Sequence, residues 1–557
     1  MIYRIDMNEG KYYTDIRVEN KLVGGRYMVD WLTTRYMSPT AHPLSAESVF
    51  VVAPGILAGT AAPCSGRLSV GGKSPMTNGI KEANAGGTAA HKLGRLGVRA
   101  LMFTGSSAEY KVLKVCREGL TLEPAGGIEM MTNYDAVAEL QRRHGEHVSI
   151  ILAGPAGVMK MINSGVSVTD TKGRPCRVAA RGGMGAVMAA KGLKAIVVDD
   201  TGSSMRKGAR EKEFAEACKA AVKLIKEDPV SQIISRFTTN GSIVSENERG
   251  GLPTFNHRAG TFGEKAMGLS PNVIMEHVKT RGSVTGHGCM PGCVLRCSTI
   301  LNDEKGGYLT SGYEFETAAA CGSNLGIGDL DMLLRIDRAC DELGIDTMEF
   351  GATVGILNDV GLFEFGDADK VMSYLEEVRQ NTPMGRIIGS GCANAAKVLG
   401  ISRVPAVKGQ ALPYHAARPL KGYGTTYATS TQGADHTAGS VEMDMDFNLD
   451  PKGKVDICRA AQINMAFFDS AGMCMFATFI NGPDKFVGLF NAMLDENWTG
   501  GDLLETGKEV LRMERAFNDK SGVGPDRLPD WLCSEPLPPT NAVFDVPPEE
   551  LDQFYNF

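Results

Sequence analysis

The hydrophobic pattern of the first 200 residues is that of short buried strands. Short apolar runs with β-branched residues end at glycine or at charged residues, as in "SVFVVAPGIL", "RALMFTG", "VSIILAGPAG" and "LKAIVVDD". Such runs are shorter than a helix needs, and their composition favours strands. Residues 1–200 are therefore predicted to form a β-rich N-terminal domain.

From about residue 210 the apolar positions recur at three- and four-residue steps, which is the period of a helix. The stretches that show it are "REKEFAEACKAAVKLIKED", "DLDMLLRIDRACDELG" and "ADKVMSYLEEVRQ", with further candidates at 455–468 and 502–517. Two mainly α-helical domains are predicted, at 201–402 and 403–557, and the fold class is α+β. The proline-rich tail "CSEPLPPTNAVFDVPPEELDQFYNF" is expected to wrap the surface.

Length and charge exclude several classes of protein. A chain of 557 residues exceeds a single hydrophobic core, so two or three domains are expected. The net charge of −7 argues against a nucleic-acid partner or a polybasic membrane surface. Neither a signal peptide nor an apolar run long enough to span a membrane is found. Thirteen scattered cysteines do not form a disulfide framework, which predicts a reduced, cytoplasmic protein.

Glycine is over-represented. The chain has 67 glycines, about 12% against a usual value of about 7%. They cluster in "GGTAAHKLGRLG", "AARGGMGAVMAAKGLKA" and "GSGCANAAKVLG". Each cluster alone could serve tight turns and close helix packing. Several together favour a large phosphate-bearing ligand, because glycine lets backbone amides approach an anion closely.

The segment "GHGCMPGCVLRCSTI" places Cys289, Cys293 and Cys297 at four-residue steps. Three thiols with one remote cysteine would hold a cubane iron–sulfur cluster. A zinc ion completed by His287 is an alternative, although structural zinc sites usually use Cys-x2-Cys pairs. Thiols packed along one face of a helix are the third interpretation. "MPG" inside the array argues against a regular helix, so the pattern favours the cluster.

A short aspartate pattern occurs twice. Asp469 precedes Cys474 in "DSAGMC", and Asp341 opens "DELGID", which contains Asp346. Each copy alone could be a helix that ends at a glycine cap. Together they suggest two similar ligands, or two halves of one ligand, with Cys474 as a candidate fourth cluster ligand.

With these motifs in order, the chain resembles the tungsten-containing aldehyde:ferredoxin oxidoreductases, of which it would be a compact member. The resemblance covers nearly the whole sequence. It is carried by "MIYRIDMNEGK", "GRLSVGGKSPMTNGIKEANAGG", "AARGGMGAVMAAKGLKAI", the cysteine loop, "GYEFET", "DELGID", "VKGQALPYHAARPLKGYGTTYATSTQGADHTAG" and "DSAGMC". It implies a bis-pterin tungsten centre, with molybdenum as the alternative metal, beside one [4Fe–4S] cluster. The β-rich domain would form the base for this cofactor.

The resemblance assigns cofactor-binding residues by motif. Arg67, Asn84 and Gly86 match positions that hold the pterin phosphates, and Arg181 adds positive charge beside them. The backbone carbonyls of Asn84 and Gly182 match ligands of a Mg²⁺ ion that bridges the phosphates. Two phosphates need cations and close amides, so these residue types suit the task.

The same comparison implies pterin-ring and cluster ligands. Asp341, Asp346 and Asp469 match residues that bond the pterin rings. A carboxylate accepts hydrogen bonds well from the amino-pyrimidinone edge of a pterin. Met473, in the same motif as Cys474, is also assigned to cofactor binding, and the four cluster ligands implied are Cys289, Cys293, Cys297 and Cys474.

Glu316 of "GYEFET" and His436 of "GADHTAG" match acid–base positions beside the metal. Glu314 is an equally placed rival. Without the resemblance, an ion pair would explain Glu316 and a satisfied buried histidine would explain His436.

The implied activity is oxidation of an aldehyde to a carboxylate, or the reverse, with electrons leaving through the cluster. A ferredoxin or ferredoxin-like subunit is the expected acceptor, in a homo- or hetero-oligomer. Three departures from the family pattern stand out: the first cysteine spacing is three residues, "TAG" follows His436, and Glu-x-x-His does not occur. Alternatives are a low-potential aromatic-ring reductase acting on a coenzyme A thioester, a non-catalytic subunit, and a zinc-binding interaction protein.

Overall fold

The computed structural model describes residues 1–441, 449–478 and 481–557. Its strands concentrate in the first 200 residues, as the hydrophobic pattern predicts. They are β1 (Ile2–Asp6), β2 (Lys11–Tyr13), β3 (Phe50–Pro54), β4 (Leu68–Lys73), β5 (Ile80–Ala85), β6 (Ala100–Thr104), β7 (Lys111–Cys116), β8 (Gly119–Pro124), β9 (Ser149–Ala153), β10 (Val166–Val168), β11 (Arg177–Ala179), β12 (Leu193–Val198), β13 (Val284–His287), β14 (Ser298–Asn302), β15 (Tyr308–Ser311), β16 (Ala406–Val407) and β17 (Gln410–Ala411).

Two six-stranded sheets form the N-terminal part of the molecule. Their strand orders are β2-β1-β6-β3-β4-β5 and β11-β10-β9-β12-β7-β8. Most neighbours are antiparallel, whereas β1 pairs with β6, and β12 with β7, in parallel. Alternate residues such as Phe50 and Val52 of one sheet share a core with Ile151 and Ile196 of the other. The two sheets therefore pack face to face as a sandwich.

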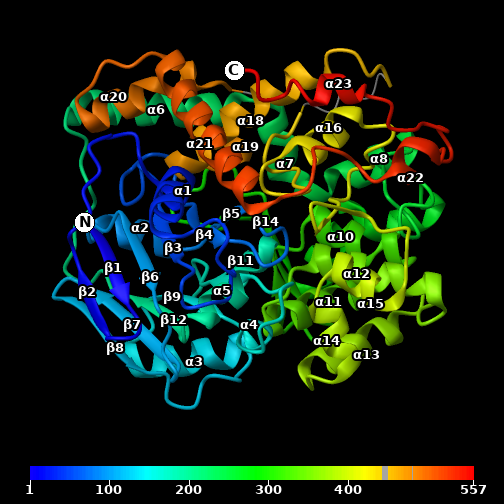
Figure 1. The fold of residues 1–557 in the computed structure, drawn as a ribbon, viewed down its shortest axis with the longest axis horizontal. Helices are drawn as coiled ribbons and strands as arrows, with labels where there is room; N and C mark the ends of the chain where they lie inside the picture. The colour runs from blue at the N-terminus through cyan, green and yellow to red at the C-terminus, as the bar shows by residue number, and fades with distance from the viewer. Residues whose placement is uncertain (442–448, 479–480) are drawn as a thin grey trace.

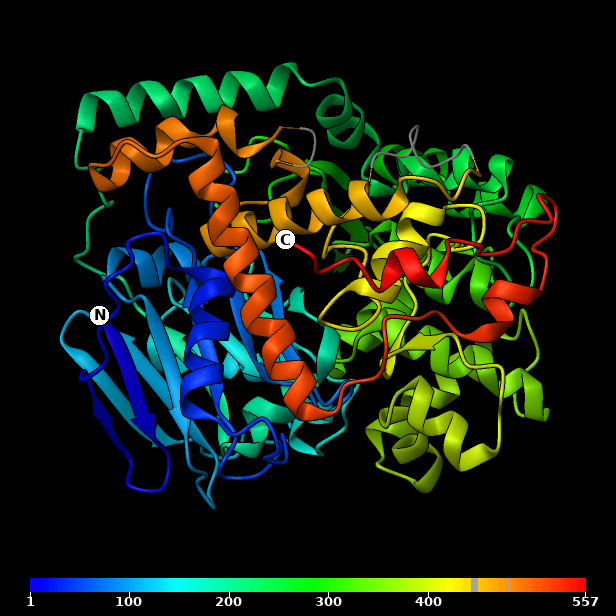
Figure 2. The same ribbon diagram turned by 45° about the horizontal axis from the view of Figure 1, so that its top comes forward.

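Helices cover the outer faces of both sheets. Val51 and Met102 point away from the sandwich and pack with Met28 of α1 (Gly25–Tyr36) and Leu511 of α21 (Gly500–Ser521). On the other sheet, α3 (Asn133–His144) packs its apolar face against β9 and β12. Figure 2 shows α21 running beside α1, so the end of the chain returns to the N-terminal sheet.

The rest of the chain is mainly helical, and the fold class predicted from the sequence is confirmed. Its helices lie beside and above the sandwich in Figure 1. The remaining α-helices are α2 (Ala89–Arg95), α4 (Pro155–Val158), α5 (Met184–Ala190), α6 (Glu211–Glu227), α7 (Pro229–Phe237), α8 (Ser242–Arg249), α9 (Pro271–Arg281), α10 (Phe315–Cys321), α11 (Leu330–Leu343), α12 (Thr347–Ile356), α13 (Ala368–Arg379), α14 (Pro383–Gly389), α15 (Cys392–Leu399), α16 (Lys421–Thr429), α18 (Lys454–Ala471), α19 (Met475–Thr478), α20 (Val487–Leu494), α22 (Asp530–Ser534) and α23 (Pro548–Leu551).

One element of this half differs from the sequence expectation. Strands β13, β14 and β15 form a small antiparallel sheet inside the predicted helical region. The cysteine loop connects β13 to β14, so its two ends are fixed by strand pairing. The strands are only four or five residues long, which is too short for their alternation to stand out among helices.

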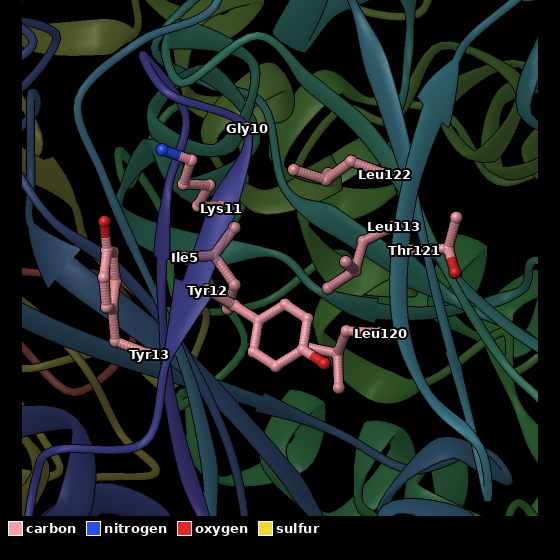
Figure 3. Close-up of a pocket in the computed structure, with 9 residues that line it drawn as sticks. All are labelled: Ile5, Gly10, Lys11, Tyr12, Tyr13, Leu113, Leu120, Thr121 and Leu122. Carbon is pink, nitrogen blue, oxygen red and sulfur yellow. The ribbon is translucent and has the colours of Figure 1, made fainter.

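A small cavity of about 450 Å³ lies between the outer hairpins of the two sheets. Figure 3 shows the Tyr12 ring from β2 turned toward Leu120 of β8. The residues that line this cavity are Ile5, Gly10, Lys11, Tyr12, Tyr13, Leu113, Leu120, Thr121 and Leu122. This lining is mostly apolar and has no group of converging polar side chains. None of the helices in the described ranges combines the length and apolar character that a membrane crossing requires.

Candidate active site

A cavity of about 930 Å³ lies where the N-terminal sheets meet the helical parts of the chain. Most of the residues singled out from the sequence line it. They are Arg67, Asn84, Gly86, Arg181, Asp341, Asp469, Cys289, Cys297, Cys474, Glu314, Glu316 and His436. Cys293, Gly182, Asp346 and Met473 are not among the lining residues. Segments far apart in the sequence thus converge on one space.

The cysteine loop is irregular, as "MPG" predicts. It packs with Cys474 in one hydrophobic cluster, to which Cys289 and Cys293 also belong. The link passes through Cys64, whose N–H donates to the Gly292 carbonyl (3.1 Å) and whose carbonyl accepts from the Cys474 N–H (2.9 Å). The remote cysteine is therefore fixed beside the loop by backbone hydrogen bonds.

Cys297 and Cys474 are buried, and Cys289 and Cys293 are partly buried. Burial raises the pKa of Cys474 to about 12. Burial, followed by the charge of Glu314 and the neighbouring thiols, raises the pKa of Cys297 well above its usual range. Thiolates gathered in such a place need cationic charge to balance them, and an iron–sulfur cluster would provide it.

The spacing of the sulfurs distinguishes a cluster from a single ion. Four sulfurs on one zinc would lie about 3.8 Å apart, since Zn–S bonds are about 2.3 Å long and tetrahedral. Among the described residues, no three cysteine sulfurs lie within 4.8 Å of one another. The ring of His287 lies 3.6 Å from Asp170. A cubane spaces its ligands more widely because each binds a different iron, so the geometry fits the cluster better.

His91 of α2 hydrogen-bonds to the cysteine loop. Its Nδ1 accepts from the Gly59 N–H at 2.9 Å, and its Nε2 lies 3.2 Å from the Pro291 carbonyl. Since Nδ1 accepts, Nε2 carries the proton and donates to Pro291. Burial lowers the pKa of His91 to about 4, which keeps the ring neutral.

Arg67 and Asn84 form one wall of the cavity. Arg67 Nε donates to Asn84 Oδ1 at 2.6 Å, and Nη2 donates to the Asn84 backbone carbonyl at 3.0 Å. Asn84 lies on β5, and a Cβ on the nearby Gly86 would come within 3.1 Å of the Cys289 sulfur. The phosphate motif and the cysteine loop are therefore in contact, and glycine is the residue that permits this approach.

Arg181 and Gly182 lie in a 3-10 turn that precedes α5. Gly182 has a φ of 84°, a left-handed conformation that glycine adopts without strain. Its carbonyl accepts from the Ser74 hydroxyl at 2.8 Å. Arg181 donates to the backbone carbonyls of Ala411 (2.5 Å) and Ala434 (2.6 Å). The carbonyls of Asn84 and Gly182 both accept protein hydrogen bonds, and each retains a second lone pair.

The two aspartate motifs have the predicted local structure. Helices α11 and α18 end at Gly344 and Gly472, both with a φ near 73°. Asp469 in the last turn of α18 accepts from Arg26 and from Asn84, each at 3.3 Å. Asp346 instead caps α12 and lies 3.4 Å from Arg181, so its carboxylate is bound by groups of the protein itself.

Several polar atoms that line this part of the cavity are buried without hydrogen-bond partners among the described residues. They are Arg177 Nε and Nη2, Ser298 Oγ, Ser311 Oγ and Asp341 Oδ2. Buried polar groups are almost always hydrogen-bonded. A guanidinium, two hydroxyls and a carboxylate in one wall fit a large polar cofactor that carries anionic and amide-like groups.

Glu316 and His436 lie together at another part of the cavity lining. The Tyr414 N–H donates to Glu316 Oε2 at 2.9 Å, and Oε1 lies 3.5 Å from His436 Nδ1. Burial lowers the pKa of His436, so its ring is neutral near pH 7. Glu314 points elsewhere: it accepts from the Thr239 hydroxyl at 2.6 Å, and its charge acts on Cys297.

Four residues of the site were not singled out in the sequence. Arg177 and Arg26 are isolated arginines whose importance arises from burial, which a sequence does not display. His91 sits in a glycine cluster that was interpreted only as a backbone feature. His415, which lies within 3.7 Å of Glu316, stands inside the motif "VKGQALPYHAARPLKGYGTTYATSTQGADHTAG" but was given no role there.

The chain is similar to known proteins over nearly its whole length. Residues 2–200 match the family model described as aldehyde ferredoxin oxidoreductase, N-terminal domain. Residues 216–557 match the model for its domains 2 and 3. The chain is 30% identical to the tungsten-containing aldehyde ferredoxin oxidoreductase of Pyrococcus furiosus, over 96% of this chain and 91% of that protein. The Pyrococcus abyssi protein of the same name is 30% identical, over 94% and 91%.

More distant proteins are also similar to this chain. A WOR-like subunit of an aliphatic sulfonate oxidoreductase from Pyrococcus furiosus is 22% identical over 89% of this chain and 82% of that protein. A solved chain of the active-site complex BamBC of benzoyl coenzyme A reductase, with 1,5-dienoyl-CoA, superposes with a TM-score of 0.82. It covers 100% of this chain and 93% of its own length at 19% identity, a similarity of fold.

Proposed function

Since the chain belongs to the aldehyde ferredoxin oxidoreductase family, we propose that it oxidises an aldehyde and water to a carboxylate. The proposed cofactors are a tungsten bis-pterin centre, a [4Fe–4S] cluster and a Mg²⁺ ion. The proposed electron acceptor is a ferredoxin or a ferredoxin-like subunit. The observation that carries the proposal is the convergence on one cavity of the cysteine loop, Cys474, the arginine-lined wall and the Glu316–His436 pair.

The wall formed by Arg67, Arg177 and Arg181 would hold the cofactor phosphates, because guanidinium groups bind phosphate strongly. Asn84, Gly86 and Gly182 would bring backbone groups close to the phosphates and to Mg²⁺. Asp341 and Asp469 would accept hydrogen bonds from the pterin rings. Asp346 would act through Arg181, which it contacts at 3.4 Å. Met473 would contribute packing from the buried cluster that also contains Cys474.

The four cysteines would hold the cluster next to the pterin wall. Gly86 approaches Cys289 closely, and the Arg67 N–H donates to the Gly472 carbonyl at 3.0 Å, two residues before Cys474. When bound there, the two cofactors would supply a two-electron oxidation and a path for single electrons to the acceptor.

Glu316 and His436 would carry out the acid–base steps. The backbone N–H of Tyr414 fixes one oxygen of Glu316, which leaves the other facing His436. A carboxylate held in this way can remove a proton from water as it adds to the aldehyde carbon. The neutral His436 can accept a second proton. Glu314 is bonded to Thr239, so it is the weaker candidate for this role.

The test is anaerobic turnover with a panel of aldehydes and a viologen dye as electron acceptor. We expect Glu316→Gln to lower kcat by roughly 10²- to 10⁴-fold, the usual contribution of a general base. Glu314→Gln is the matched control, and it should reduce kcat far less. Equal losses in both variants would remove the assignment to Glu316. Absence of aldehyde oxidation, together with reduction of an aromatic acyl coenzyme A thioester, would replace the proposed activity with the ring-reductase alternative.

A further inference from the structure

Four titratable side chains form a continuous line from the cavity into the protein. His436 Nδ1 lies 3.5 Å from Glu316 Oε1, which in turn lies 3.7 Å from His415 Nε2. The other ring nitrogen of His415, Nδ1, lies 2.6 Å from Glu246 Oε1. Glu246 belongs to α8 and is fully buried. Glu316 and His436 are the proposed acid–base pair, whereas His415 and Glu246 have no role in that proposal.

The ring of His415 is held rigidly. It stacks on Phe315 with 4.5 Å between ring centroids and 17° between planes. It stacks on Tyr423 from the other side, at 4.5 Å and 6°. A ring clamped between two aromatic faces can turn only within its own plane, and the short contact with Glu246 fixes that rotation. The Nε2 edge therefore stays directed toward Glu316.

The Glu246 contact also fixes the tautomer of His415. A carboxylate accepts hydrogen bonds, so the neutral ring carries its proton on Nδ1 and donates it to Glu246. The lone pair of Nε2 then faces Glu316 Oε1. The same logic orients the histidine of a Ser-His-Asp triad, where a buried carboxylate sets the tautomer and stabilises the imidazolium once formed.

The proposed function gives this arrangement a task. Conversion of an aldehyde and water to a carboxylic acid releases two protons and two electrons. The electrons pass to the ferredoxin-type acceptor, whereas the protons must be taken up inside a buried cavity. Resting on that proposed function, we propose that Glu246 and His415 form a proton-accepting pair for Glu316 in aldehyde oxidation.

Each step conserves atoms and charge. The Glu316 carboxylate removes one proton from water as the water oxygen bonds to the aldehyde carbon, and so becomes a carboxylic acid. It then donates that proton to His415 Nε2, and the resulting imidazolium is stabilised by the Glu246 carboxylate. Glu316 returns to its ionised state for the next turnover. The distance of 3.7 Å must shorten for this transfer, as catalytic hydrogen bonds commonly do when substrate binds. His415 is thus a positioning and proton-accepting residue that acts through Glu316.

The experiment compares the wild-type holoenzyme with Glu246→Gln and His415→Phe. Glutamine keeps the shape of Glu246 without its charge, and phenylalanine keeps a flat ring between Phe315 and Tyr423 without a nitrogen. The matched control is His257→Phe, because His257 is also buried and stacks on a tyrosine, Tyr414, but does not line the cavity. Metal and pterin contents are measured on every variant.

Single-turnover and steady-state kinetics supply the decisive readouts. Reduction of the cluster is followed by absorbance, proton release by a pH indicator, and both are repeated in D₂O. We expect Glu246→Gln and His415→Phe to lower kcat by roughly 10- to 100-fold, less than loss of the base itself. KM should stay within about twofold of wild type, and the solvent isotope effect should rise because proton transfer becomes limiting. His257→Phe should match the wild type in all three quantities.

Other results would overturn the proposal. Wild-type kcat and isotope effect in both variants, with full cofactor content, would remove the pair from the reaction and leave the proposed function intact. A bound divalent cation that is lost in His415→Phe would assign Glu316, His415 and His436 to a metal site, since their ligand atoms lie within 4.8 Å of one another. A wild type that oxidises no aldehyde would remove the proposed function and this role together.

A readout independent of turnover checks the tautomer. Nitrogen-15 NMR of the histidine-labelled full-length protein should show one ring protonated at Nδ1 and bare at Nε2. That signal should disappear in His415→Phe and shift in Glu246→Gln. An Nε2-protonated His415 would contradict the pair whatever the activity.

Discussion

The imidazole of His91 donates a hydrogen bond to the carbonyl of Pro291 at 3.2 Å and so joins α2 to the cysteine loop. Its other nitrogen accepts from the Gly59 N–H. The bond from the Gly59 N–H requires the neutral ring, because a protonated imidazole has no lone pair to accept it. The support of the loop is therefore coupled to the protonation of one buried side chain.

A pH dependence of stability follows from this coupling. The pKa of His91 is about 4 in the folded protein against an ordinary value of 6.5. Between these values the unfolded chain binds the extra proton, so stability is fully present above pH 6.5 and decreases as pH falls toward 4. The loss amounts to roughly 3 kcal/mol. Urea unfolding of wild type and His91→Gln across this window measures it, and a difference between them that does not vary with pH would contradict it.

The buried ion pair between Arg26 and Glu514 is the second basis for a prediction. Arg26 bonds both oxygens of Glu514, at 2.8 and 2.9 Å, and the carboxylate is fully buried. Glu514→Gln should destabilise the protein by about 3 kcal/mol, because it leaves a buried guanidinium without its main counter-charge.

The matched control for this prediction is Glu505→Gln. Glu505 pairs with Arg512 at the surface, where both side chains are nearly half exposed. Such pairs contribute up to about 1 kcal/mol. In denaturant unfolding, Glu514→Gln should therefore lose clearly more free energy of unfolding than Glu505→Gln. Equal losses would show that the Arg26 network contributes little to stability.

The orphaned guanidinium of Arg177 predicts a loss of cofactor on substitution. We expect Arg177→Met to fold and to retain iron, but to contain less tungsten and pterin than wild type after gel filtration. The exposed Arg142, which pairs with Glu139, supplies the control Arg142→Met. Full tungsten content in Arg177→Met would mean that the guanidinium does not bind the cofactor.

Replacement of the cysteines one at a time tests the ligand set. Serine at Cys289, Cys293, Cys297 or Cys474 should each lower the iron content and alter the electron paramagnetic resonance signal of the reduced protein. Cys533→Ser is the control, because Cys533 is exposed in the C-terminal segment. A variant at Cys293 with wild-type iron would place the ligand elsewhere, and Cys64, whose thiol contacts Cys293, would be the next candidate.

Local patterns in the sequence predicted much of this molecule. Short apolar runs predicted β3, β6, β9 and β12, and the helical period predicted α6, α11, α13, α18 and α21. Motif order identified the residues that converge on the cavity, including Cys474, far along the chain from the cysteine loop. Each of these strands, helices and motifs can be recognised from a short stretch of neighbouring residues.

What the sequence did not reveal depends on long-range packing. Arg177 has no distinguishing neighbours in the chain, and its unpaired nitrogens are apparent only once β11 is placed against the cavity. His415 gains its role from Glu246 and Glu316, which are 169 and 99 residues away. The short sheet β13-β14-β15 was missed because its strands are brief and flank an irregular loop.

The most direct test of the account is the composition of the anaerobically purified protein. The account predicts about four irons and four acid-labile sulfides per chain, with one tungsten or molybdenum and a pair of pterins. One zinc ion with neither sulfide nor pterin would contradict it, because the cysteine loop would then be structural and the cavity would hold no redox cofactor.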